Sequence, residues 1–201
     1  LVLVVAGFIR ERGLRGEAER ARAAAQTEAA KAGAVSSFLA ELLSSADPMK
    51  AQGREVTVAD VLAQAAARIN DNPTLGAQPA VEAAVRLAIG NTYLSLGKHV
   101  EAREHLERAV ELRGGLEARD SEALAAMASL GDAYTRLGLY DRAEPILRKV
   151  LEIRVQTRGQ DHPASLAAMN KLGDLLWTAG KRDEVERLDR TTLEIRRRVL
   201  G

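Results

Sequence analysis

The composition describes a folded and nearly neutral chain. Of its 201 residues, 46% are apolar, and 29 lysines and arginines balance 28 aspartates and glutamates to a net charge of +1. This balance disfavours nucleic acid as a partner. The absence of cysteine excludes disulfides, thiolate metal sites and thiol nucleophiles.

The chain begins with an apolar run, Leu1–Ile9, that is broken only by Gly7. The run is too short to cross a bilayer, which needs about 20 residues. It is either a short buried segment or, as we expect from the basic residues Arg10, Arg12 and Arg15 behind it, the end of a transmembrane helix.

Residues 10–47 are expected to form a long amphipathic helix. Its seam residues recur at alternating steps of four and three, as in a heptad repeat: Leu14, Ala18, Ala21, Ala25, Glu28, Ala32, Val35, Leu39 and Leu42. Most of them are alanine and one is charged, so the pattern favours a helix more than pairing. A homodimer through Leu14–Leu42 stays an open alternative.

A loop and a capping helix are expected over residues 48–78. Thr57 and Asp60 have the spacing of a capping box, in which the side chain of each residue accepts a hydrogen bond from the backbone N–H of the other. The helix that begins there should end at Asn70, before Pro73. Its apolar face should pack on the element that follows.

One unit then recurs three times, over residues 79–120, 121–162 and 163–201. The phrase Ile-Gly-Asn-Thr-Tyr at Ile89–Tyr93 returns in similar form at Leu130–Tyr134 and Leu172–Leu176, at intervals of 41 and 42 residues. A second phrase, Glu-Leu-Arg or Glu-Ile-Arg, returns at the same intervals. A fixed period of this size predicts a solenoid whose units bury their apolar faces by stacking.

Each unit should be a helix pair. The first helices are expected at Pro79–Leu96, Ser121–Leu137 and Pro163–Ala179, and the second at Val100–Arg113, Asp141–Thr157 and Asp183–Leu200. Gly97, Gly138 and Gly180 should close the first helices in the left-handed conformation. Asp141 with Glu144, and Asp183 with Glu186, are placed to cap two of the second helices.

The units resemble tetratricopeptide repeats. Small residues at Gly90, Ala102 and Ala109 alternate with large ones at Ile89, Tyr93 and Leu106, as that pattern requires. The longer period is similar to that of the 42-residue repeats of kinesin light chains. The resemblance implies an all-α fold, a right-handed solenoid of antiparallel helix pairs. The third unit departs from the pattern at Val185, Asp189 and Thr192, which predicts a loosely packed second helix.

The upstream segments Val35–Leu39, Leu42–Pro48 and Gly53–Leu62 resemble the region behind the membrane helix of bacterial receptor-like serine/threonine protein kinases. That resemblance implies a membrane-anchored protein with a kinase domain upstream and the repeats outside the cytoplasm. The basic residues after Ile9 favour the cytoplasmic side instead, so the side stays open.

No catalytic chemistry is expected within this chain. It holds no glycine-rich phosphate loop, His-Arg-Asp loop or Asp-Phe-Gly motif. Its three histidines, His99, His105 and His162, have no metal-ligand spacing and are expected to be solvated or capping residues. We therefore expect no metal and no cofactor.

The tetratricopeptide resemblance places a protein-binding groove on the first helices. It comprises the residues after the repeat glycines and those one turn to either side: Leu87, Asn91, Ser95, Ala128, Asp132, Arg136, Asn170, Asp174 and Thr178, with Trp177 beside them. Their amide and carboxylate groups could accept from an extended peptide. They could equally be solvated surface residues, and Trp177 could cover a further repeat instead of anchoring a ligand.

The function that these observations favour is a protein-protein interaction module that binds a peptide or protein in its concave face, as the sensor or docking region of such a kinase. The alternatives are a structural or oligomerisation element and a free-standing adaptor without a kinase.

Overall fold

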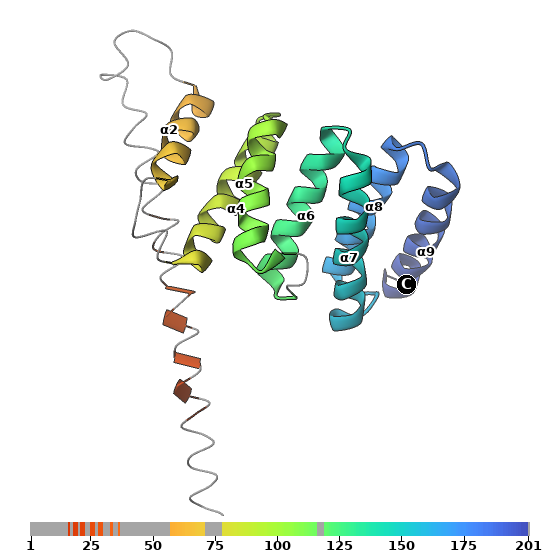
Figure 1. Cartoon of the computed structure of the whole chain (residues 1–201). Coiled ribbons are helices and arrows are strands. Elements are labelled where there is room, and N and C mark those ends of the chain that lie inside the picture. The colour runs from red at the N-terminus through yellow and green to blue at the C-terminus, as the bar shows by residue number, and fades with distance from the viewer. Residues whose placement is uncertain are drawn as a thin grey trace, which may run out of the picture.

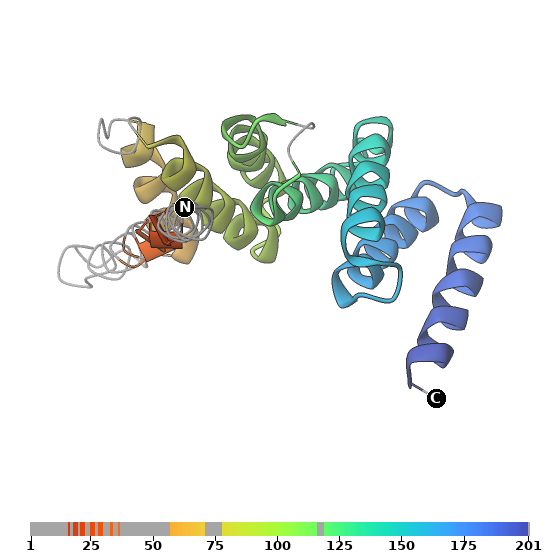
Figure 2. The same cartoon turned by 90° about the horizontal axis from the view of Figure 1, so that it is seen from below.

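The computed structural model describes residues 57–70, 78–115 and 119–200, together with isolated positions between 16 and 36. The described helices are α2 (Val58–Asn70), α4 (Pro79–Ser95), α5 (His99–Leu112), α6 (Ser121–Arg136), α7 (Tyr140–Arg158), α8 (Pro163–Thr178) and α9 (Arg182–Leu200). They follow one another in chain order across the molecule (Figure 1). The view from below shows α2 at one end of this row and α9 at the other (Figure 2).

The expected all-helical solenoid is confirmed. Each helix of the three pairs begins and ends within one residue of its expected bounds. The turn glycines Gly97, Gly138 and Gly180 have φ of 72°, 73° and 77°, a region that L side chains rarely adopt. The long helix expected over residues 10–47 lies mostly outside the described residues, as does the run Leu1–Ile9.

The helix α2 begins at the expected capping box. The Thr57 N–H donates to Oδ2 of Asp60 at 3.0 Å, and the Asp60 N–H donates to Oγ1 of Thr57 at 3.2 Å. Leu62 and Ile69 are buried and belong to the same apolar core as the repeats. Because α2 contacts α4, it covers the otherwise open end of the first pair.

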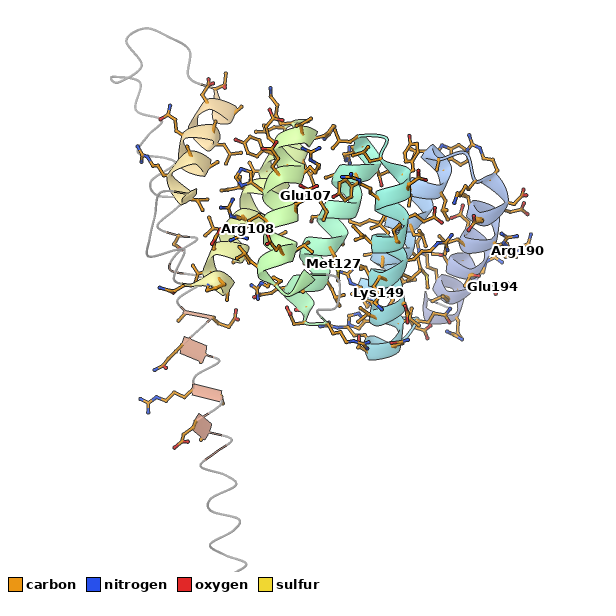
Figure 3. All side chains as sticks on the ribbon, in the orientation of Figure 1. Glu107, Arg108, Met127, Lys149, Arg190 and Glu194 are labelled. Atoms are coloured by element: carbon orange, nitrogen blue, oxygen red, sulfur yellow. The ribbon has the colours of Figure 1, made fainter. Side chains whose placement is uncertain are left out.

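The first two pairs are held by a close approach of their helices at a glycine. A Cβ added to Gly90 would lie 2.6 Å from Cγ of Leu106, and one added to Gly131 would lie 2.5 Å from Cδ2 of Leu147. Both leucines are fully buried. Side chains fill the spaces along the row, Met127 among them, while Arg190 and Glu194 project from α9 at its end (Figure 3).

The third pair is looser, as its sequence predicts. A Cβ at Gly173 would meet only Cδ2 of Leu188, at 3.8 Å. Asp189 stands where Leu147 stands in the second unit, and Val185 replaces the small residue that lets the helices approach. The α8–α9 pair is therefore not closed by a leucine against its glycine.

The recurring arginine of the second helices contacts a first helix in each unit. The guanidinium of Arg113 donates to the carbonyl of Ala80 at 3.3 Å and pairs with Glu122. Arg154 donates to the carbonyl of Ala164 at 3.1 Å. In the third unit Arg196 donates to Oδ1 of Asn170 at 3.1 Å. The repeated Glu-Leu-Arg phrase thus supplies a contact between helices.

The expected capping pair at the start of α7 is wrong. Leu139 occupies the N-cap of α7 and makes no side-chain cap, and Asp141 lies inside the first turn. Glu144 instead accepts from Nζ of Lys181 at 2.7 Å and from Nε of Arg148 at 2.9 Å. Arg148 also pairs with Glu184 at 2.5 Å, so these charges join α7 to α9. The hydrogen bond from Lys181 is the largest effect that lowers the pKa of Glu144.

The expected membrane-anchored location is contradicted. Within residues 57–70, 78–115 and 119–200 and the isolated positions before them, no helix is long and apolar enough to cross a membrane.

The core of the first pair contains polar groups that the sequence did not predict as buried. Arg86 and Glu82 form an ion pair at 2.6 Å with side chains only 11% and 8% exposed. The ring of His105 stacks on Tyr93, with centroids 5.7 Å apart, and its Nδ1 is buried without a partner in the described residues. Burial, and secondarily the charge of Arg86, lowers the pKa of His105 to about 4. His105 is therefore a partly buried, neutral residue and not a fully solvated one.

The first prediction compares two repeat glycines. Gly131→Ala forces a methyl group against buried Leu147, and overpacking of this kind costs about 1–3 kcal/mol, against about 1 kcal/mol gained in helix propensity. Gly173→Ala, the matched control, gains the propensity without the clash. Chemical denaturation should show a lower free energy of unfolding for Gly131→Ala than for Gly173→Ala. Equal values would contradict the close approach at Gly131.

The second prediction concerns pH. Because the folded state lowers the pKa of His105 from 6.5 to about 4, the unfolded chain binds more protons between these values. The free energy of unfolding should fall as the pH is lowered through this range, by about 1–2 kcal/mol from this residue after allowance for its partial exposure. His105→Gln should lack this part of the decrease.

The measurement is the difference in unfolding free energy between wild type and His105→Gln. It should stay nearly constant between about pH 8 and 7, where neither the folded nor the unfolded chain takes up the proton on His105. Below about pH 6.5 it should change in favour of the variant. A difference that is the same at pH 7 and pH 4.5 would show that His105 is not buried in its neutral form.

Candidate functional site

The first helices α4, α6 and α8 form the face on which the groove was expected. Helix α6 contacts both α4 and α8 directly, so equivalent positions on the three helices lie next to one another. The residues after the repeat glycines are Asn91, Asp132 and Asp174. Asn91 and Asp174 are exposed, and Asp132 is partly buried.

Asp132 is already occupied within the chain. Its Oδ1 accepts from Nε of Arg136 at 2.9 Å, and its Oδ2 accepts from Nζ of Lys171 on α8 at 3.3 Å. The pair with Lys171 ties α6 to α8. The middle of the expected row of acceptors is therefore neutralised, whereas the side chains of Asn91 and Asp174 have no hydrogen-bond partner among the described residues.

The flanking positions differ in how much surface they offer. Ala128 is buried and Leu87 packs against the core, so both support the face more than they line it. Ser95 and Thr178 are exposed, but their hydroxyls donate to backbone carbonyls of their own helices, at 2.7 and 2.9 Å. Asn170 is exposed and accepts from Arg196 of α9.

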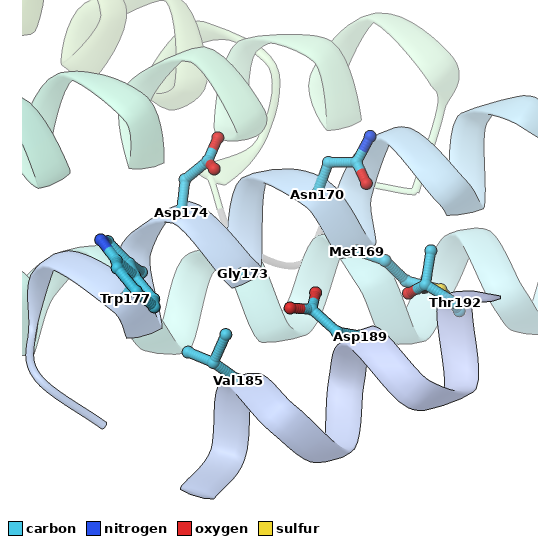
Figure 4. Close-up of a pocket in the computed structure, with 8 residues that line it drawn as sticks. All are labelled: Met169, Asn170, Gly173, Asp174, Trp177, Val185, Asp189 and Thr192. Carbon is cyan, nitrogen blue, oxygen red and sulfur yellow. Dashed lines mark hydrogen bonds between the residues drawn. The ribbon is translucent and has the colours of Figure 1, made fainter. Parts of the chain in front are cut away.

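A pocket with a cavity volume of about 410 Å³ opens between α8 and α9 (Figure 4). It is lined by Met169, Asn170, Gly173, Asp174, Trp177, Val185, Asp189 and Thr192. Three of these, Asn170, Asp174 and Trp177, were expected in the groove. The other five were not, although Val185, Asp189 and Thr192 had already been marked as departures from the repeat pattern.

Trp177 is the most exposed large apolar residue of the described chain, with 58% of its surface accessible. The guanidinium carbon of Arg182 lies 3.6 Å from its ring centroid. Such stacking of a cation on an indole face is favourable by about 0.5–1 kcal/mol at an exposed site. Trp177 thus already holds a guanidinium supplied by α9.

His162, the third histidine, caps α8. Its Nδ1 accepts from the N–H of Ala164 at 3.1 Å, and its backbone is extended as the N-cap position requires. This confirms the capping role for one of the three histidines.

Comparison with known proteins places the helix pairs in a family. Two family models, both described as tetratricopeptide repeat, match residues 83–115 and 121–198. No curated protein matches the chain. The comparisons give no evidence for the resemblance to bacterial receptor-like kinases.

Two solved structures have a similar fold. A putative kinesin light chain of Podosopora anserina with nearly identical TPR-like repeats is 23% identical, with a TM-score of 0.58 over 71% of this chain and 67% of that one. BtubC (BKLC) from P. vanneervenii is 16% identical, with a TM-score of 0.59 over 84% of this chain and 74% of that one. At these identities the likeness shows the fold alone. Residues 83–115 and 121–198 are therefore tetratricopeptide repeats, a generally non-catalytic module of protein-protein interaction.

Proposed function

We propose that this chain binds an extended peptide or protein segment along the face formed by α4, α6 and α8. The observation that carries the proposal is the pair Asn91 and Asp174. They occupy the same repeat position on the two helices that flank α6, both are exposed, and neither side chain is satisfied within the described residues.

The spacing of the helices suits a short extended ligand. Adjacent helices pack about 8–10 Å apart, so the distance from α4 to α8 is about twice that value. At about 3.3 Å per residue, roughly six extended residues cover it. Backbone N–H groups of such a segment can donate to the Asn91 amide oxygen at one end and to the Asp174 carboxylate at the other.

The proposal does not include a kinase or an assembly role. No comparison supports an upstream kinase domain, and the seam Leu14–Leu42 lies mostly outside the described residues. A homodimer through that seam stays a prediction of the sequence.

The third prediction tests the face with peptides selected on the wild-type chain from a displayed random library. Their affinity, measured by fluorescence polarisation, should fall about tenfold or more in Asn91→Ala with Asp174→Ala, because two charge-assisted or amide hydrogen bonds are lost. The control is Gln156→Ala, an exposed change on α7, which should leave the affinity unchanged.

Two results would contradict the proposal. One is a library that yields no peptide with saturable binding. The other is a set of peptides that bind the double variant as tightly as the wild type, which would place the binding surface elsewhere on the molecule.

A further inference from the structure

We propose that the pocket between α8 and α9 receives an arginine side chain of the bound partner. This inference rests on the proposed peptide-binding function and adds a specificity determinant to it. It concerns the third repeat, where a pocket lined by two carboxylates opens between the two helices of the pair.

The pocket exists because a core residue is replaced. In the first two pairs Leu106 and Leu147 fill this space, so close to the repeat glycine that a methyl group would collide with them. In the third pair the corresponding residue is Asp189, and a Cβ added to Gly173 would meet only Cδ2 of Leu188, at the ordinary contact distance of 3.8 Å. The cavity of about 410 Å³ is at the small end of ligand pockets, a size that suits one long side chain.

Its charge selects a cation. Asp174 from α8 and Asp189 from α9 both line the pocket (Figure 4). Neither carboxylate forms an ion pair with any other residue that the structure describes. A guanidinium that enters the pocket can therefore form charge-assisted hydrogen bonds with either carboxylate.

The aromatic wall favours a guanidinium over an ammonium. The ring of Trp177 is exposed to solvent. It already stacks with the guanidinium of Arg182, whose central carbon lies 3.6 Å from the ring centroid. The chain's own arginine thus demonstrates that a planar cation is accepted there. Arginine combines this stacking with a fork of N–H donors that matches a carboxylate, whereas lysine offers a point charge.

The rim defines what a ligand must accommodate. Arg182 lies on the indole and Arg196 donates to Asn170 at 3.1 Å, so two cations already border the recess. A partner arginine must therefore reach the carboxylates from the open side of α8, the side on which Asp174 is exposed. Because Asp174 is also on the proposed peptide face, one side chain of a peptide lying there can enter the pocket.

The fourth prediction uses the intrinsic fluorescence of the whole chain, in which Trp177 is the sole tryptophan. Titration with N-acetyl-arginine amide should change this fluorescence saturably. The neutral isostere N-acetyl-citrulline amide should bind about tenfold or more weakly, and N-acetyl-lysine amide should lie between them. Equal responses to the arginine and citrulline amides would overturn the proposal.

The decisive variant is Asp189→Leu. It restores the residue type of the first two units, fills the pocket and removes one carboxylate, so it should raise the thermal midpoint while abolishing the response to arginine amide. A gain in stability rules out unfolding as the cause of lost binding. Asp189→Asn, which keeps the size and removes the charge, should weaken binding about tenfold. Wild-type binding by both variants would overturn the inference.

The peptides selected for the proposed function separate the two ideas. If they bind the α4–α6–α8 face of the wild type but do not need an arginine, and Asp189→Leu binds them unchanged, this inference fails and the proposed function stands. If no peptide binds while arginine amide still does, the peptide-binding function fails and the pocket is left as a site for small guanidinium ligands.

Discussion

The close approach of two helices at a glycine is the constraint on which the rest of the structure depends. At Gly90 and Gly131 the facing leucine occupies the volume that a side chain would need, and this contact fixes how near the second helix of a pair lies to the first. The first helices can then contact one another directly, α6 with both α4 and α8. The face that we assign to ligand binding is built from these three first helices.

Charged contacts join α7 to α9 at the C-terminal end of the described chain. Between α7 and α9, Glu144, Lys181, Arg148 and Glu184 form a connected network, next to a pair whose glycine has no leucine against it. Exposed ion pairs contribute about 0–1 kcal/mol each, less than a buried leucine, which contributes about 2–5 kcal/mol. The third pair is therefore expected to be the least stable of the three and the easiest to rearrange around a ligand.

The helix bounds could be read from the sequence because local residues decide them. Proline at the first turn, glycine with positive φ after the last turn and the Thr57–Asp60 box each act within a few residues, whatever packs nearby. The period itself then located the glycines of the helix pairs. Where the sequence failed, the deciding partner lies far along the chain. Asp132 pairs with Lys171 from the next unit and Glu144 with Lys181, in addition to an arginine four residues on in its own helix, so the contacts between units could not be assigned from one helix.

The pocket between α8 and α9 was not predicted, because its presence depends on contacts between two helices and not on local residues. A departure from a repeat pattern shows that the usual packing is lost, but not whether the neighbouring helix closes the gap. Here a Cβ added to Gly173 would meet only Cδ2 of Leu188, at 3.8 Å, and a pocket remains between the two helices. An aspartate at a former core position is tolerated only if it reaches solvent or a cation, because a buried, unpaired carboxylate costs several kcal/mol. Asp189 is exposed, and its recess meets the binding face at Asp174. The loss of one leucine therefore converts part of a core into a charged surface beside the proposed groove.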